Sequence, residues 1–168
     1  MSNTTQNQTD GYVISKNGHK ATIQFGCKEI PNEMFKENDE IVSVTLPNSV
    51  KTVGDFAFCG CMALRELKLP DSIIGLGFDA ISFCPLLEEL HIPENVTLIG
   101  GSFAGCTSLK NISVDSNNPV YCNKGNCLID TDEKTLMWGC SNSTIPNDGS
   151  VTKIGREAFY RCTFQEIH

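Results

Sequence analysis

Apolar residues recur along most of the chain at a fixed spacing. The segments 51–73 and 74–96 align without a gap at an offset of 23 residues, and the aligned positions carry similar side chains. A period of this length is typical of a solenoid, in which one small structural unit is stacked repeatedly. The matched positions are Val53, Gly54, Ala57, Phe58, Cys61, Leu64, Leu67, Leu69, Pro70 and Ile73 in the first segment, and Leu76, Gly77, Ala80, Ile81, Cys84, Leu87, Leu90, Ile92, Pro93 and Val96 in the second.

The same pattern continues on both sides of these two segments. One further copy precedes them, a copy with a one-residue deletion follows them, and the pattern resumes near the end of the chain. In the first three copies, an apolar residue and a proline follow the position of His168. The final copy is therefore expected to stop within its strand. The predicted repeats are 28–50, 51–73, 74–96, 97–114 and a partial repeat at 151–168.

Each repeat divides into two halves with different patterns. Around LRELKLP, apolar and polar residues alternate, as in a strand with one buried face. Pro47, Pro70 and Pro93 end this half, because proline cannot donate a hydrogen bond to a strand ladder. The half around VGDFAFCGC is compact and predicts a short helical turn on the opposite side. Together the two halves predict an α/β repeat solenoid with a parallel sheet.

The recurring motif resembles that of the BspA-like leucine-rich-repeat family. The resemblance is carried by VGDFAFCGCMALRELKLP, IGGSFAGCTSLKNISV and IGREAFYRC, and it covers roughly residues 28–168. It implies a curved right-handed solenoid with the sheet on the concave side, and it implies no catalysis. Members of the family are mostly bacterial or protist surface proteins thought to bind matrix or host proteins.

Three segments fall outside the period. Residues 1–10 are polar and are expected to form a disordered leader, whereas residues 11–27 contain two alternating runs around Asn17-Gly18. Asn-Gly is a strong hairpin turn signal, so we predict an N-terminal hairpin cap over the first repeat. Between the fourth and the last repeat, residues 115–148 predict an inserted β-hairpin in which residues 135–139 pair back on residues 127–130.

Composition and charge exclude several classes of protein. The formal net charge is −7 and the pI is near 4.9, and the basic residues are scattered. Nucleic acids and anionic membranes attract clustered Lys and Arg, so neither is an expected partner. No stretch is apolar enough to insert into a membrane, and the start of the chain lacks the pattern of a signal peptide. That start suggests a cytoplasmic protein, whereas the family resemblance suggests the cell surface or secretion.

The nine cysteines occupy four kinds of position, and Cys27, before the first repeat, is expected in the core of the cap. Cys61, Cys84, Cys106 and Cys162 share one repeat position and predict a column of small buried thiols. Cys59 stands at a position that varies between repeats. In the insertion, a Cys122–Cys127 or a Cys127–Cys140 disulfide is an alternative to free thiols in packed strands. The spacing of these cysteines is poor for zinc, since no fourth ligand lies nearby.

No arrangement of residues indicates catalysis or a cofactor. His19, His91 and His168 have no cysteine or acidic partner at a spacing typical of a nucleophile. Glu88 and Glu89 are neighbours on one strand and therefore point to opposite faces, so they do not form an acid–base pair. We predict neither catalytic residues nor metal or cofactor ligands, and a thiol- or metal-dependent protein is the least favoured reading.

The polar strand positions that flank the buried leucines predict a partner-binding surface. Solenoids commonly bind proteins on such a face, although a solvated sheet surface has the same pattern. The preferred function is a non-enzymatic protein-binding module, possibly a segment of a surface adhesin, and the alternative is an intracellular interaction or inhibitor protein. Trp138 and the hairpin tip offer a second surface. The residues of the predicted face are Ser43, Thr45, Glu66, Lys68, Glu89, His91, Asn111 and Ser113, with Glu166 and His168 in the last repeat.

Overall fold

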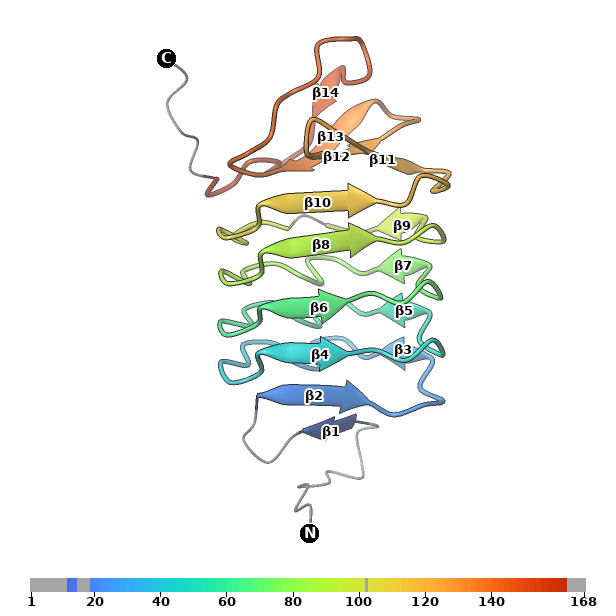
Figure 1. Cartoon of the computed structure of the whole chain (residues 1–168), viewed down its shortest axis with the longest axis vertical. Helices are drawn as coiled ribbons and strands as arrows, with labels where there is room; N and C mark the ends of the chain where they lie inside the picture. The colour runs from blue at the N-terminus through green and yellow to red at the C-terminus, as the bar shows by residue number, and fades with distance from the viewer. Residues whose placement is uncertain (1–11, 15–18, 102, 163–168) are drawn as a thin grey trace.

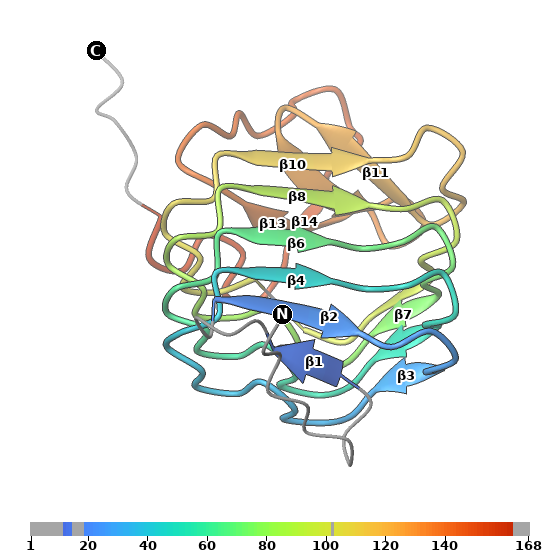
Figure 2. The ribbon, with the colours of Figure 1, turned by 60° about the horizontal axis from the view of Figure 1, so that its bottom comes forward.

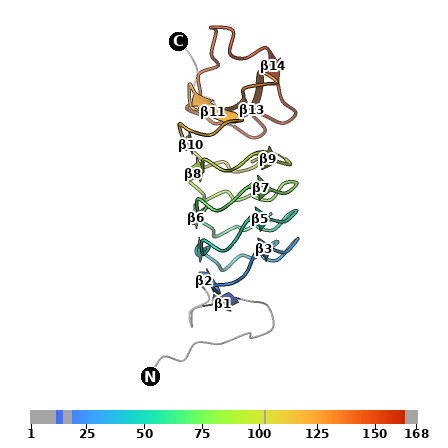
Figure 3. The same cartoon turned by 90° about the vertical axis from the view of Figure 1, so that its right-hand side faces the viewer.

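The computed structural model describes residues 12–14, 19–101 and 103–162. Short strands are stacked as rungs along one long axis, and each rung contributes a strand to two opposite sides of the column (Figure 1). Figure 3 shows the column edge-on, with the two stacks of strands on either side and the rungs in a nearly straight line. The predicted parallel-sheet solenoid is therefore confirmed, but its rungs lie nearly in line and not along the curve that the family resemblance implies.

The first stack of strands follows the predicted period. Its strands are parallel, and within the ladders β2–β4–β6 and β8–β10 each residue pairs with its counterpart in the next repeat. The central residue of each strand is buried and its neighbours point outward, as the alternation predicted. The strands are β2 (Lys20–Ile23), β4 (Ser43–Thr45), β6 (Glu66–Lys68), β8 (Glu89–Ile92) and β10 (Asn111–Val114).

The second stack corrects the prediction of helical turns. None of the described residues is helical, and the opposite side of each rung holds a two-residue strand followed by consecutive tight turns. These strands form a continuous parallel sheet in the order β3–β5–β7–β9. They are β3 (Glu29–Ile30), β5 (Thr52–Val53), β7 (Gly75–Leu76) and β9 (Leu98–Ile99).

The turns cannot become helical because alternate backbone donors bond to the next rung. Ala57 N donates to Gly54 O within its own turn at 3.3 Å, whereas Phe58 N donates to Ala80 O of the following repeat at 2.8 Å. An α-helix would use both donors internally, and its diameter of about 10 Å exceeds the strand spacing of about 4.8 Å. Phe56 and Gly60 also have positive φ angles of 55° and 75°, which interrupt any right-handed helix.

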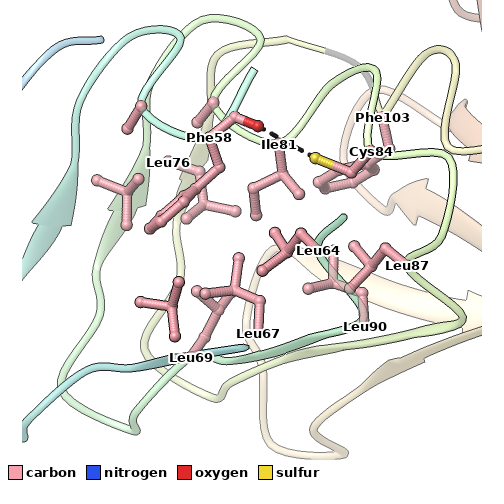
Figure 4. Close-up of a cluster of buried hydrophobic side chains, with 14 of the residues drawn as sticks. Phe58, Leu64, Leu67, Leu69, Leu76, Ile81, Cys84, Leu87, Leu90 and Phe103 are labelled. Atoms are coloured by element: carbon pink, nitrogen blue, oxygen red, sulfur yellow. Dashed lines mark hydrogen bonds between the residues drawn. The ribbon is translucent and has the colours of Figure 1, made fainter. Parts of the chain in front are cut away.

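The core fills the space between the two stacks. Figure 4 shows Phe58, Leu64 and Leu67 packed against the matching residues of the next rung. The rings of Phe35 and Phe58 are stacked, with centroids 5.4 Å apart and planes at 7°. Equivalent residues therefore contact each other from rung to rung, which is why one repeat cannot bury its apolar side chains alone.

The cysteine column is confirmed for Cys61, Cys84 and Cys106, whose thiols are hydrogen-bonded as well as packed, whereas Cys162 is only half-buried. Cys61, Cys84 and Cys106 are buried, and the Sγ of each donates to a backbone carbonyl of the preceding repeat at 3.1 Å. Figure 4 shows this bond between Cys84 and the carbonyl oxygen of Phe58. Cysteine therefore suits this position for two reasons: its side chain is small, and its thiol donates to a buried backbone carbonyl.

A short antiparallel pair covers the N-terminal end of the column. β1 (Tyr12–Ile14) pairs with β2 in the register Tyr12 to Ile23, and β2 then pairs with β4 as the first strand of the parallel stack. Viewed from this end, β1 lies beside β2 at the foot of the ladder (Figure 2). The predicted turn at Asn17-Gly18 and the predicted leader at residues 1–10 lie outside the described residues.

The insertion forms three antiparallel strands, one more than predicted. The expected pair is confirmed: β12 (Cys127–Asp130) pairs with β13 (Thr135–Gly139) from Cys127 opposite Gly139 to Asp130 opposite Thr135. The additional strand, β11 (Tyr121–Lys124), joins β12 through a two-residue turn at Gly125 and Asn126, each with φ of 58°. Positive φ at both positions is the geometry of a type I′ hairpin turn.

The repeat pattern resumes on the insertion and not on the fourth repeat. β14 (Lys153–Ile154) pairs in parallel with β13, and Cys162 Sγ donates to Gly139 O at 3.1 Å. The inserted strands thus provide the surface on which the last repeat begins. All nine cysteines lie in the described residues as free thiols, so neither of the disulfides considered as alternatives is formed.

Candidate functional site

The eight predicted partner-binding residues lie on one surface, which we call the front face. It consists of the outward side chains of β4, β6, β8 and β10, the strands that lie at the front of the column in Figure 1. Ser43 is half-buried, and the other seven residues are exposed. Glu166 and His168, expected to continue this face, lie outside the described residues.

The strand register arranges the front face in two columns. Because the side chains alternate, residues two apart on a strand share a face and equivalent residues stack across strands. The acidic column contains Ser43, Glu66, Glu89 and Asn111, and the basic column contains Thr45, Lys68, His91 and Ser113. The two columns are named for the charges at their centres.

The front face contains two shallow depressions. The larger has a volume of about 800 Å³ and lies over β6, β8 and the start of β10, with Leu67, Leu69 and Leu90 in its lining. The smaller has a volume of about 450 Å³ and lies over β4 and β6. All eight predicted residues line one depression or the other. Charged side chains on the rim and leucines in the floor give each depression a mixed character.

The larger depression coincides with a break in the sheet between β6 and β8, which we call the seam. Backbone ladders join β2 to β4, β4 to β6 and β8 to β10, but within the described residues no ladder joins β6 to β8. Figure 1 shows these two strands farther apart than the neighbouring strands of the stack. The opposite sheet, β3–β5–β7–β9, continues past the seam without a break.

The polar groups of the front face interact mainly along and between neighbouring strands. Glu66 and Lys68 form an ion pair at 3.1 Å, and Asn111 Nδ2 donates to Glu89 Oε1 at 3.2 Å. His91 Nδ1 lies 2.9 Å from Ser113 Oγ. All six side chains are exposed, so these contacts add little to stability and can rearrange when a partner binds.

The described residues offer no site for a metal ion. No group of three His, Cys, Asp or Glu side chains in residues 12–14, 19–101 and 103–162 is close enough to hold one. Burial raises the pKa of the thiols of Cys59, Cys122 and Cys127. The neighbouring thiol of Cys84 lowers the pKa of Cys61, but the side chain of Cys61 is fully buried. These thiols therefore lack the combination of exposure and a low pKa that a nucleophile requires.

Cys162 allows a direct test of thiol reactivity. Burial raises the pKa of its thiol to about 11, so the thiolate is scarce at pH 8. A thiolate with a higher pKa is a better nucleophile, but this gain is smaller than the loss of thiolate. Iodoacetamide should therefore alkylate Cys162 about tenfold more slowly in the folded protein than in urea. Mass spectrometry of the Cys162 peptide after timed quenching measures both rates, and equal rates would show that the thiol is not protected.

Trp138 is not available as a contact residue. Its side chain is only 2% exposed, and its ring packs edge-on against Phe103 with centroids 6.1 Å apart. The prediction of a second binding surface around Trp138 is therefore wrong. The residue alternates inward on β13, where it extends the core of the solenoid into the insertion.

Sequence reasoning missed an apolar region on the opposite side of the column. Phe78 and Leu98 are exposed there, and Phe78 lines a depression of about 430 Å³ together with Met137 of β13. Phe78 and Leu98 stand at repeat positions occupied by polar residues in the second repeat, Asp55 and Thr52. Comparing residue types at these outward positions would have revealed the change.

Comparison with known proteins gives one family and a consistent fold. The family model for the BspA type leucine-rich repeat region, with six copies, matches residues 28–148 and 133–168. Comparison with curated proteins gives no match. Among the described residues, no helix has the length and apolar character needed to cross a membrane.

Solved structures of bacterial proteins share the fold. A leucine-rich cell surface protein of Faecalibacterium prausnitzii A2-165 has 30% sequence identity and a TM-score of 0.72 over 82% of this chain. The pneumococcal vaccine antigen PcpA has 20% identity and a TM-score of 0.73 over 90%. A leucine-rich repeat protein of Bacteroides ovatus has 27% identity and a TM-score of 0.53 over 81%. The chain spans 37%, 46% and 38% of these three chains, respectively.

Proposed function

Because the chain belongs to the BspA-type leucine-rich-repeat family, we propose that it is a non-enzymatic module that binds a protein partner through its front face. The observation that carries the proposal is the gathering of all eight predicted residues around two adjoining depressions on one sheet. The ladders of the two stacks hold the backbone of these strands in place, so a partner meets a largely preformed surface whose exposed side chains can adjust. A similar structure is that of a cell surface protein, which favours a role as a segment of an adhesin.

The charge pattern of the front face provides the test. We expect the wild-type protein to bind a partner saturably when screened against immobilised extracellular-matrix and cell-surface proteins. Reversing Glu66, Lys68 and Glu89 together should weaken that binding at least about tenfold, because like charges then face each other across the contact.

A matched control uses charges on the opposite side of the column. Glu29 and Lys51 are exposed there, at and just before the second stack of strands. Glu29→Lys alone, which makes the same net change in charge as the front-face reversal, and the reversal of both residues should each leave binding unchanged. Equal loss of binding in the front-face and control variants would indicate a nonspecific charge effect, and no loss in the front-face variant would contradict the proposal.

A second candidate is an intracellular interaction or inhibitor protein. It is favoured by the nine cysteines, none of which forms a disulfide. Cytosolic proteins keep such thiols reduced, whereas exported proteins commonly oxidise them. Thiol titration of unfolded protein from its native source distinguishes the two compartments: nine titratable thiols favour the intracellular candidate, and fewer favour export.

A further inference from the structure

We propose that the seam between β6 and β8 binds an extended peptide segment that carries a basic and an acidic side chain two residues apart. This inference rests on the proposed function and specifies the partner chemistry at the larger depression. The partner segment would lie along the strands, with its basic side chain over the acidic column and its acidic side chain over the basic column.

Among the described strands of the two stacks, neighbours are joined by a backbone ladder except at the seam. β6 is bonded to β4, and β8 is bonded to β10. The edges of β6 and β8 that face each other form no backbone ladder. The larger depression lies over this interruption, so a partner placed there contacts two strands that no ladder joins.

Like charges meet across the seam in the acidic column. Glu66 and Glu89 occupy equivalent repeat positions on its two sides, and in the basic column the equivalent positions hold the charged Lys68 and the imidazole of His91. Like charges at opposed positions on neighbouring strands repel each other. A cation above Glu66 and Glu89, and an anion above Lys68 and His91, would each be attracted from both sides of the seam.

The contacts already present favour this arrangement. The Glu66–Lys68 pair is highly exposed, so its two charges remain available to a partner. His91 Nδ1 lies within hydrogen-bond distance of Ser113 Oγ. In the tautomer in which Nδ1 accepts the serine proton, Nε2 carries the ring proton and can donate to a carboxylate.

The geometry of an extended chain matches the two columns. Residues 66 and 68, like residues 89 and 91, are separated by two positions along a strand, or about 6.6 Å. In an extended partner, side chains two residues apart lie on one face at the same distance. Leu67, Leu69 and Leu90 line the depression, but their side chains are buried in the core, so the charged pair carries the recognition.

The test uses the peptide TTVKTEVTT and two controls, TTVKTKVTT and TTVETEVTT. Backbone amide chemical shifts of the full chain are followed by NMR as each peptide is added to about 5 mM, which detects weak binding. We expect shifts at Leu67, Lys68, Glu89 and Leu90 with TTVKTEVTT. The control peptides should bind at least about tenfold more weakly, because each places one charge over a column of the same sign.

A charge substitution should switch this preference. Glu89→Lys puts a cation into the acidic column, so we expect it to weaken binding of TTVKTEVTT at least about tenfold and to strengthen binding of TTVETEVTT. Glu29→Lys, which makes the same charge change on β3, should alter neither. A melting curve of each variant, followed by Trp138 fluorescence, verifies that it is folded.

Each other outcome contradicts the proposal in a defined way. Equal shifts with all three peptides would show nonspecific contact, and no shifts at 5 mM, a concentration chosen for weak binding, would show that the seam does not bind extended peptides. A preference for TTVKTKVTT or TTVETEVTT would assign the face to a uniformly basic or acidic partner. The peptides can cause no chemical-shift changes while reversal of the front-face charges still abolishes binding of the protein partner. In that case only the peptide inference is wrong, and the proposed function stands.

Discussion

Replacing Phe58 with alanine is expected to lower the free energy of unfolding by about 3–5 kcal/mol, the usual cost of truncating a buried aromatic side chain. Phe58 has no exposed surface and stacks on Phe35 of the preceding rung. Its loss would leave a cavity between two rungs whose backbones are held by hydrogen bonds on both sides. Since rung spacing is set by these ladders, the neighbours cannot collapse into the cavity, so the upper part of the range is expected.

Urea unfolding followed by Trp138 fluorescence and circular dichroism measures this effect. Trp138 is the single tryptophan and is buried, so its emission reports on loss of packing. Phe25→Ala provides the control, because Phe25 is 89% exposed, and should change the unfolding free energy by no more than about 0.5 kcal/mol. A loss below about 1 kcal/mol for Phe58→Ala would contradict a rigid core between the stacks.

Replacing Asn126 with glycine is expected to lower the free energy of unfolding by about 2–3 kcal/mol, because it removes two hydrogen bonds to the edge of β10. Asn126 Oδ1 accepts from Ile112 N at 3.0 Å, and its Nδ2 donates to Lys110 O at 2.5 Å. The side-chain amide thus takes the place that the backbone of a further strand would occupy. Glycine suits the positive φ of this position, so the substitution removes the side chain without straining the turn.

Asn142→Gly is the matched control for this second prediction. Asn142 is exposed in the same insertion, so the control makes the same change in composition and in the flexibility of the unfolded chain. The difference in unfolding free energy between the two variants then measures the contacts of the Asn126 side chain, which are the two bonds to β10 and a weaker one to Cys140 Sγ at 3.1 Å. Equal values would show that Asn126 does not hold the insertion against the fourth repeat.

The strands of the first stack could be predicted because their pattern is local and repeated. Leu67 and Leu90 alternate with charged residues, and one face of each strand must leave water, so the buried side follows from the sequence. The helical turn around Phe58 could not be excluded in this way. A compact apolar segment fits a helix or a set of tight turns, and the carbonyls of the next rung select the turns.

The insertion shows the same limit. The pairing of residues 127–130 with 135–139 follows from two apolar runs separated by turn residues. β11 was missed because its four residues, YCNK, do not alternate clearly and pair only through the type I′ turn. Trp138 was placed on the surface because a residue outside the repeat has no equivalent position from which its orientation can be inferred.

The sequence by itself determined the period, the inward and outward positions of the strands, and the residues that form the front face. Each of these depends on alternation within a few residues and on its recurrence in the next repeat. The tertiary structure alone decided the turns, the capping of β10 by Asn126 and the break between β6 and β8. These features depend on which donors, acceptors and charges a neighbouring rung presents, and such contacts between distant segments exist only once the rungs are stacked.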